Sequence, residues 1–379
     1  VLTPKQVFSG LSNSTVVLFA GMFVLGAAMF QTGLAQRIGI TVVHAAGTGE
    51  KRLMAAIMVV TIILSSVSTD TATVAGLLPV VLQICGVASL AVSPQLMALA
   101  VAANVGGTIT MIGTPPNILM SATLSASGLQ PFGFFEFAWI GIPLSIAGVI
   151  YMLTIGRRLC PHGHVDSNLS DLTSDLPKDT RKMTICAIIL ILVVIAMARS
   201  KTINVPMQTA AIIGALACVI TGCLSEKQAY GGIDWTTIFL FAGMLPLAEA
   251  MDKTGAGAMI ANGVVGIIGS NASPLIIVMA MFLLSCGLTQ FMSNTAAAAL
   301  LAPIGISIAQ SIGVSPFPVL MAIGIAASCA FTTPVATPPN TLILGPGKFR
   351  FMDYVKVGLP LVVVSMIVCI VIIPLVWPF

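Results

Sequence analysis

"SNTAAAALLAP", residues 293–303, lies in a run from Thr254 to Gly347 that contains no Asp, Glu, Lys or Arg. A similar stretch, "TDTATVAGLLP", occupies residues 69–79, which is 224 positions earlier. Four further pairs occur in the same order at similar spacing, so the chain contains a duplicated unit. These pairs are KQVFSGLS (5–12) with KQAYGGID (227–234), LFAGM (18–22) with LFAGM (240–244), TPPN (114–117) with TPPN (337–340), and GIPL (141–144) with GLPL (358–361).

The composition predicts a protein that crosses a membrane many times. Hydrophobic residues make up 57% of the chain, charged residues only 7%, and the mean hydropathy is +1.07. A soluble domain carries roughly 25% charged residues. The chain also has many apolar stretches of about the 20 residues that a membrane-spanning helix needs. We therefore predict an all-α, multi-pass protein of the cell membrane, surrounded by the lipid bilayer.

Several other classes of protein are disfavoured. Basic residues lie at the ends of apolar segments, a pattern that orients membrane proteins, so we predict no nucleic-acid partner. The eight cysteines form no CxxC pair and are interpreted as small hydrophobic residues. The apolar segments contain no GxSxG or HExxH motif, so we predict that the protein is not an enzyme.

Internal duplication in a membrane protein is typical of secondary transporters, whose repeats are often inverted relative to each other. We predict a first repeat over 1–155, a cytoplasmic connector over 156–182 and a second repeat over 183–379. The connector holds five Lys or Arg residues, which favours the cytoplasmic side. Two apolar helices precede KQAYGGID but only four residues precede its mate, so we expect at least two further helices ahead of Val1. The expected helical segments are 14–32, 33–48 (amphipathic), 53–68, 72–90, 95–113, 116–126, 134–155, 183–199, 206–223, 235–252, 257–269, 273–292, 296–313, 317–335, 339–346 and 355–377.

Two polar clusters, at 69–71 and 293–295, each separate two short apolar segments. This pattern predicts two re-entrant hairpins whose tips lie at membrane depth, where irregular backbone is tolerated only if it is buried or lines a wet cavity. Ser, Thr, Asp and Asn favour helix N-caps, so a helix should begin at each tip. The positive end of such a helix attracts an anion, and the carbonyls that end the preceding helix suit a cation.

TPPN predicts a broken helix in each repeat. Each Pro lacks an N–H donor and disfavours helical geometry at the preceding residue, so the chain should break near Thr114 and Thr337. Such a break frees the carbonyls of Gly113 and Ala336, and discontinuous helices are where transporters coordinate Na⁺. A lone TPPN is more often a simple kink, and a lone Ser-Asn-Thr is as often a contact between helices. The duplication of both elements favours a binding site.

The paired clusters, the paired TPPN and "GPGKFRFMDYVKVGLPL" (345–361) resemble the divalent anion–sodium symporter family of the ion transporter superfamily. The resemblance covers essentially the whole chain. It implies a homodimer in which a transport domain moves against a scaffold like an elevator. It also implies transport of a small anionic substrate, either a di- or tricarboxylate such as succinate or citrate, or sulfate, coupled to Na⁺.

The resemblance also implies two Na⁺ sites and one substrate site. The first Na⁺ site would use Ser65, Thr69, Asp70, Gly113 and Thr114. The second would use Thr289, Ser293, Asn294, Ala336 and Thr337. The substrate would contact Asp70, Thr71, Thr114, Pro115, Asn294, Thr295, Thr337 and Pro338.

Asp70 departs from the family pattern, which has Asn at this position. A carboxylate at membrane depth costs about 2.5–3.5 kcal/mol even on lenient scales, so a functional role is favoured. We hypothesise that Asp70 ligates Na⁺ or exchanges a proton (H⁺). The alternatives are therefore a cation/proton antiporter or an anion exchanger of the same superfamily, with a channel as a weaker one. The sequence leaves open the anion, the Na⁺ stoichiometry and the choice between symport and exchange.

Overall fold

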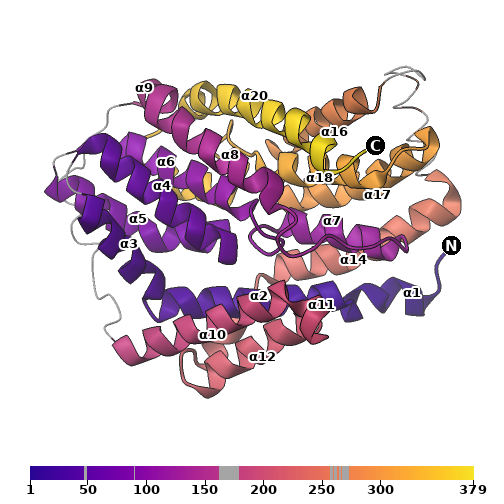
Figure 1. The fold of residues 1–379 in the computed structure, drawn as a ribbon, viewed down its shortest axis with the longest axis horizontal. Coiled ribbons are helices and arrows are strands. Elements are labelled where there is room, and N and C mark those ends of the chain that lie inside the picture. The colour runs from indigo at the N-terminus through magenta and orange to yellow at the C-terminus, as the bar shows by residue number, and fades with distance from the viewer. Residues whose placement is uncertain are drawn as a thin grey trace.

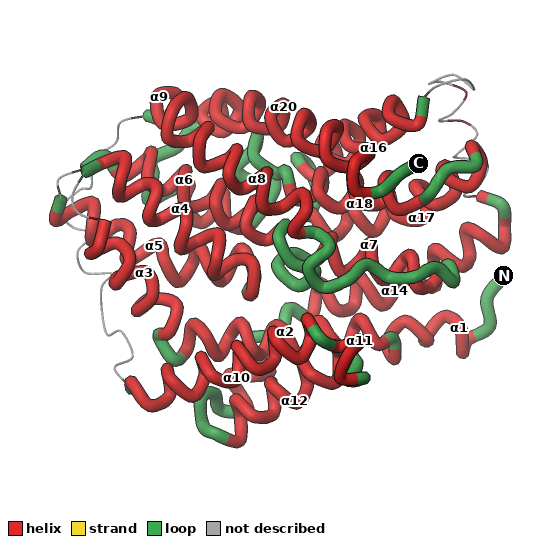
Figure 2. The backbone as a smooth tube through the Cα atoms, viewed as in Figure 1, coloured by secondary structure: helices red, strands yellow, loops and turns green. Residues whose placement is uncertain are grey.

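The computed structural model describes residues 1–46, 49–88, 90–161, 179–256 and 273–379, together with 259, 263 and 266. These residues form helices joined by loops, and no strand occurs in the described part of the chain (Figures 1 and 2). The order of the helices follows the predicted segments. The predicted helix over 257–269 and most of the predicted connector lie outside the described residues.

The first repeat consists of helices joined by loops. A short helix and one turn of 3₁₀ helix precede the first long helix, and the repeat ends in a helix that includes a π-helical turn. The bounds are α1 Pro4–Phe8, η1 Ser9–Ser12, α2 Ser14–Gln31, α3 Leu34–Ala46, α4 Glu50–Val67, α5 Asp70–Val87, α6 Val92–Gly107, α7 Pro115–Ala126, α8 Ala138–Tyr151, η2 Met152–Gly156 and α9 Arg157–Leu159.

The second repeat follows the same plan after two long additional helices, α10 and α12, and the short α11 between them. Two predicted segments, 95–113 and 317–335, correspond to α6 and α18, and both helices end earlier than expected. The bounds are α10 Thr180–Ala198, α11 Ser200–Ile203, α12 Met207–Ile220, α13 Glu226–Gly231, α14 Trp235–Thr254, α16 Pro274–Thr289, α17 Asn294–Ile312, α18 Pro316–Ser328, α19 Pro338–Leu344 and α20 Phe351–Val376.

Six helices of the described chain are long and apolar enough to cross a membrane. The longest uninterrupted one, α20, shows why it suits lipid. Leu359, Val363, Ile367, Val371 and Leu375 repeat every fourth residue and are 46–77% exposed, which places one apolar stripe on the outside. A water-soluble fold would hide such a stripe, so the face fits a bilayer.

The helices form two groups. α2 packs against α12 and α10 along one side of the molecule, below the remaining helices in Figure 1. Gly21 allows this close packing, because a Cβ there would lie 2.9 Å from the backbone carbon of Ala211. The larger group contains α4 to α8 and α16 to α20. We refer to the first group, with α14, as the scaffold helices.

Two helical hairpins enter the larger group. Ser65 on α4 contacts the Ala103 carbonyl on α6, and Gln95 at the start of α6 contacts the Glu50 carbonyl at the start of α4. α4 and α6 are therefore parallel, and α5 returns to the end from which α4 came. α16 and α18 are related in the same way, through Ser285 to the Ile323 carbonyl and Thr289 to the Ala327 carbonyl. Each predicted hairpin is thus a pair of antiparallel helices, and the depth of its tip in the membrane stays a prediction.

Candidate functional site

The two hairpin tips are built by N-caps. Thr69 precedes α5, and its hydroxyl oxygen accepts a hydrogen bond from the Ala72 N–H at 3.3 Å. Ser293 precedes α17 and accepts from the Ala296 N–H at 3.2 Å. Each cap satisfies one orphan donor of a helix start and fixes the direction in which the chain leaves the tip. The N-terminal ends of α5 and α17 therefore lie at the two tips, and each end carries a partial positive charge.

The two TPPN motifs break their helices as predicted. Thr114 and Thr337 have extended backbone, with φ of −141° and −148°, and α7 and α19 begin at the following proline. The side chain of Asn117 donates to the Gly107 and Thr110 carbonyls at 3.3 and 2.9 Å. It thereby satisfies carbonyls that the end of α6 leaves without a helical partner.

Asn340 performs the same task in the second repeat. Its amide donates to the Ala330 and Thr333 carbonyls, both at 2.8 Å. Thr110 and Thr333 also correspond, because their hydroxyls accept from the N–H groups of Gly113 and Ala336. The last residue of TPPN therefore holds the break open, and the two breaks have equivalent internal bonding.

One side-chain pair links each tip to the helix before it. Ser65 Oγ lies 2.7 Å from Asp70 Oδ1, and Thr289 Oγ1 lies 2.7 Å from Asn294 Oδ1. Ser65 Oγ also lies 2.8 Å from the Ala103 carbonyl. A hydroxyl has a single proton, and both neighbours of Ser65 are acceptors. An ionised Asp70 thus leaves this group of oxygens short of positive charge.

In the first predicted Na⁺ set, two oxygen atoms lie close to Gly107. A Cβ added to Gly107 would lie 2.3 Å from Asp70 Oδ1 and 3.1 Å from the Gly113 carbonyl oxygen. The absence of a side chain at Gly107 therefore lets two predicted ligand oxygens approach the backbone closely, and we call this place the notch. Hard oxygen ligands of this kind suit a hard cation such as Na⁺. The corresponding residue of the second repeat is Ala330, identified by its bond to the second TPPN asparagine.

A cavity of about 420 Å³ brings the tips and breaks together. All eight predicted substrate contacts line it, as do Thr69, Ser293 and Ala336 of the predicted Na⁺ sets. Three other predicted ligands, Ser65, Gly113 and Thr289, do not line the cavity, and Ser65 and Thr289 are completely buried. Its volume falls in the range of about 300–1,000 Å³ that is usual for small-molecule sites.

The cavity wall includes residues that the sequence did not single out. They are Phe23 on α2, Gly232 and Asp234 between α13 and α14, and Thr237 on α14. Asp234 caps α14, because it accepts from the Thr237 N–H at 3.1 Å and from the Thr237 hydroxyl at 2.6 Å. Its position at the end of KQAYGGID, a repeat match, was the available signal. Asp70 and Asp234 are acidic, and no Lys, Arg or His lines the cavity in the described part of the chain.

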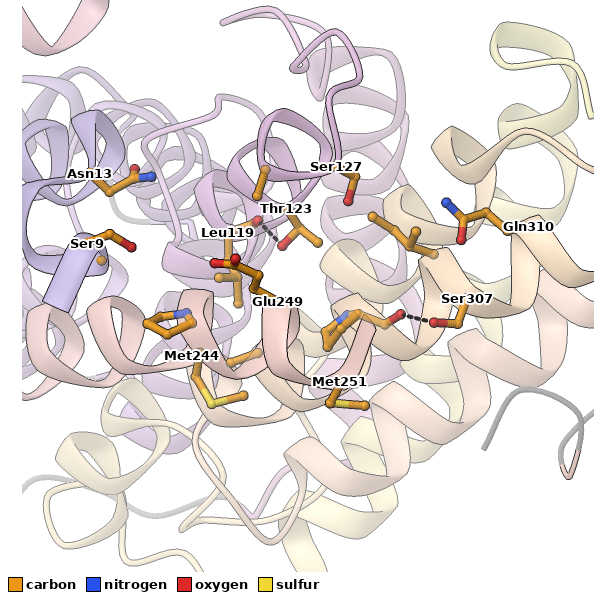
Figure 3. Close-up of a pocket in the computed structure, with 16 residues that line it drawn as sticks. Ser9, Asn13, Leu119, Thr123, Ser127, Met244, Glu249, Met251, Ser307 and Gln310 are labelled. Carbon is orange, nitrogen blue, oxygen red and sulfur yellow. Dashed lines mark hydrogen bonds between the residues drawn. The ribbon is translucent and has the colours of Figure 1, made fainter. Parts of the chain in front are cut away.

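A second cavity, of about 300 Å³, lies farther along α7 and α17 (Figure 3). Its wall includes Ser9, Asn13, Thr123, Glu249 and Gln310, so it also touches η1 and α14. Glu249 accepts from the Gln6 amide at 2.8 Å and pairs with Lys253 at 2.7 Å. None of the predicted site residues lines it. We therefore assign the functional site to the cavity of about 420 Å³ at the hairpin tips.

Comparison with known proteins agrees with this architecture. A sequence model of the citrate transporter family matches residues 1–316 and, in a second match, residues 270–379. The uncharacterized transporter YfbS of Escherichia coli K12 is 25% identical, over 100% of this chain and 93% of the relative. The sodium-dependent dicarboxylate transporter SdcS of Staphylococcus aureus RF122 is 28% identical, over 100% of this chain and 79% of the relative. The YdaH transporter of Alcanivorax borkumensis has a similar fold, with a TM-score of 0.73 and 14% identity over 98% of this chain and 87% of that structure.

Proposed function

The chain belongs to the citrate transporter family, and we propose that it couples Na⁺ entry to the uptake of a small divalent anion. It is a multi-pass membrane transporter and not an enzyme. The substrate class that we propose is a di- or tricarboxylate such as succinate or citrate, or sulfate. The similarity to a sodium-dependent dicarboxylate transporter supports both the cation and the carboxylates. The mechanism that we propose is an elevator-type movement of the site across the membrane.

The observation that carries this proposal is the charge of the cavity at the hairpin tips. An anion needs positive charge, yet the described wall offers only uncharged groups and two carboxylates. The starts of α5 and α17 reach the cavity with backbone N–H groups and helix dipoles that provide part of that charge, and the starts of α7 and α19, whose first two residues are prolines, add their dipoles. Na⁺ bound by the two predicted sets would provide the rest.

The residues then have separate roles. We propose that Thr71 and Thr295 donate hydroxyl hydrogen bonds to the anion from the two tips. Ser65 and Thr289 orient the side chains of Asp70 and Asn294 from behind the tips, at the distances given above. Because the tips and breaks are assembled around the predicted ligands, Na⁺ binding and anion binding should favour the same arrangement.

Uptake into proteoliposomes tests the proposal. Labelled succinate, citrate and sulfate are offered with an inward Na⁺ gradient, with equal Na⁺ on both sides, and with K⁺ in place of Na⁺. We expect one of these anions to accumulate only when the Na⁺ gradient is present. Equal uptake under all three conditions would exclude Na⁺ coupling.

Two alternatives can be tested in the same way, and the acidic wall favours the first, a cation/proton antiporter. Asp70, a buried member of the first predicted Na⁺ set, could carry a proton in exchange for Na⁺. A cation/proton antiporter predicts Na⁺ flux and internal pH change without any organic anion in the same vesicles. An anion exchanger predicts uptake that requires an anion inside and ignores Na⁺. The same vesicle preparation therefore distinguishes the antiporter and the anion exchanger from Na⁺-coupled anion uptake.

We also propose that the protein is a homodimer, as its resemblance implies. The scaffold stretch 239–251 exposes apolar side chains, including Phe239 at 61% and Leu247 at 45%. Cross-linking in native membranes would test this arrangement, with a dimer-sized product as the expected result.

A further inference from the structure

Two side-chain hydrogen bonds cross between the repeats in the buried interior. The amide of Asn104 on α6 donates to Asn340 Oδ1 on α19 at 3.4 Å. The hydroxyl of Ser328 on α18 lies 3.5 Å from the Thr114 hydroxyl, which precedes α7, and 3.5 Å from the Gly324 carbonyl of its own helix. All four side chains are at most 4% exposed. Each bond joins the helix before one break to the start of the short helix after the other break.

The direction of the first bond is fixed by its surroundings. The Asn340 amide nitrogen already donates to two carbonyls, so its oxygen must face α6. Among the described residues, the amide nitrogen of Asn104 is the donor to that oxygen. The Asn104 oxygen is then left without a partner in the interior. Within the described part of the chain, the contact with Asn340 is therefore the one hydrogen bond of the Asn104 side chain.

Each crossing bond is connected to predicted Na⁺ ligands. Ser65, which contacts Asp70, also contacts the carbonyl of Ala103, the residue before Asn104. At the other end, Asn340 binds the Thr333 carbonyl. The Thr333 hydroxyl in turn accepts from the Ala336 N–H at 3.1 Å.

The second crossing bond is more direct. Ser328 contacts Thr114, which is itself a predicted ligand of the first Na⁺ site. Ala327 directly precedes Ser328 in the chain, and its carbonyl accepts from the hydroxyl of Thr289, a residue of the second predicted Na⁺ set, at 2.8 Å. Contacts therefore run without a gap from one predicted cation site to the other, by two routes.

We propose that Asn104 and Ser328 are positioning residues that couple the two Na⁺ sites. This inference rests on the proposed function, because it takes both sets as Na⁺ sites. A cation in the first set orders Thr114 and the end of α6, and the crossing bonds order the second break with them. The second cation then meets a site that is already arranged, so the first raises the affinity for the second.

Equilibrium binding of radioactive Na⁺ to the purified protein, without substrate, tests the coupling. We expect the unaltered protein to bind Na⁺ cooperatively, with a Hill coefficient between 1 and the upper limit of about 2 for two sites. Occupancy of one site should raise the affinity of the other by roughly 5- to 150-fold, the usual range of coupling. The double variant Asn104→Ala/Ser328→Ala should bind as many ions with a Hill coefficient of about 1.

Two further variants separate coupling from damage to the fold. Ser328→Thr keeps the hydroxyl and should keep the cooperativity that Ser328→Ala weakens, a comparison that holds even if the double variant does not fold. Gln95→Ala removes another completely buried amide from α6, whose bond to the Glu50 carbonyl is far from both breaks, and should leave the Hill coefficient unchanged.

Cooperative binding that persists in the double variant would overturn the inference, as would independent binding of two ions by the unaltered protein. An unaltered protein that binds no Na⁺ would contradict the proposed function itself. The two failures are therefore distinguishable.

Discussion

Asp70 and Asn294 occupy equivalent positions in the two repeats and make the same contact with different charge. Each accepts at 2.7 Å from the hydroxyl five residues before it. The second repeat thus shows that an amide fits this geometry. The carboxylate of Asp70 must therefore serve an electrostatic purpose rather than a steric one. We propose that it strengthens cation binding at the first predicted Na⁺ site and weakens the attraction for an anion nearby.

Asp70→Asn should separate these effects. The amide keeps the contact with Ser65, but the first Na⁺ loses a charged ligand. We expect the Na⁺ concentration for half-maximal uptake to rise about tenfold, which corresponds to about 1.4 kcal/mol. The measurement is anion uptake against external Na⁺ in proteoliposomes. The reciprocal change, Asn294→Asp, should lower that concentration, and identical Na⁺ curves for all three proteins would contradict the assigned role.

Gly107 makes a steric prediction. Gly107→Ala would place a methyl group 2.3 Å from Asp70 Oδ1, so the carboxylate would have to leave the notch. We expect the protein to bind one Na⁺ fewer and to lose most of its uptake. Gly148→Ala is the matched control, because its Cβ would meet only Val105 side-chain atoms at 3.7 and 3.8 Å. Unchanged Na⁺ binding by Gly107→Ala would show that the notch holds no ion.

The helix breaks show how far sequence reasoning reaches at the scale of elements. The proline pairs predicted that the helices break, because their effect on the preceding residue is local. They did not predict that α6 ends at Gly107 and α18 at Ser328, several residues before the expected 113 and 335. Those ends depend on Asn117 and Asn340, whose amides reach back ten residues to the carbonyls of Gly107 and Ala330.

The cavity wall shows the same limit. The family resemblance carried by the duplicated motifs implied all eight predicted contacts that line it. It did not find Phe23 or Thr237, since these come from scaffold helices, and their distance from the tips is set by packing between the two groups. The duplication therefore predicts what a single repeat presents, and the structure adds what faces it.

Asn340→Asp tests the bonding that holds the second break. The change preserves the shape of the side chain but removes its N–H donors, leaving two buried carbonyls facing a carboxylate. Each unsatisfied buried group costs about 1–3 kcal/mol, so we expect a clear fall in the thermal stability of the purified protein and loss of uptake. Asn13→Asp is the control. Asn13 caps α2 through its oxygen, which accepts from the Thr15 N–H at 2.8 Å, and Asp caps helices as well as Asn. Equal stability of the two variants would contradict the proposed role of the TPPN amide.

The positions of the charged residues indicate how the whole molecule is oriented in the membrane. Glu50 at the start of α4 pairs with Arg157 on α9 at 3.8 Å, and Lys51, Arg52 and Arg158 lie beside them in the chain. α5 returns to this same end, because the start of α6 contacts the start of α4. Basic residues favour the cytoplasmic side. In Figure 1, α5 and α17 extend from the centre of the molecule toward opposite ends.

This arrangement predicts which side of the membrane each hairpin enters. Val87 near the end of α5 and Ser311 near the end of α17 are 224 positions apart, the spacing of the repeats, and both are exposed. If the repeats are inverted in the membrane, these two positions lie on opposite sides. We expect Ser311→Cys to react with a membrane-impermeant maleimide on intact cells. Val87→Cys should react only after the cells are opened.

The unaltered chain provides the background for that experiment. All eight of its cysteines are buried, so labelling of the unaltered protein should be weak. Each variant is scored as the ratio of labelling before and after the cells are opened, with uptake as the check that it has folded. Labelling of both positions from the same side would show that the hairpins enter from one face. It would remove the symmetry from which alternating access is argued, whatever the substrate proves to be.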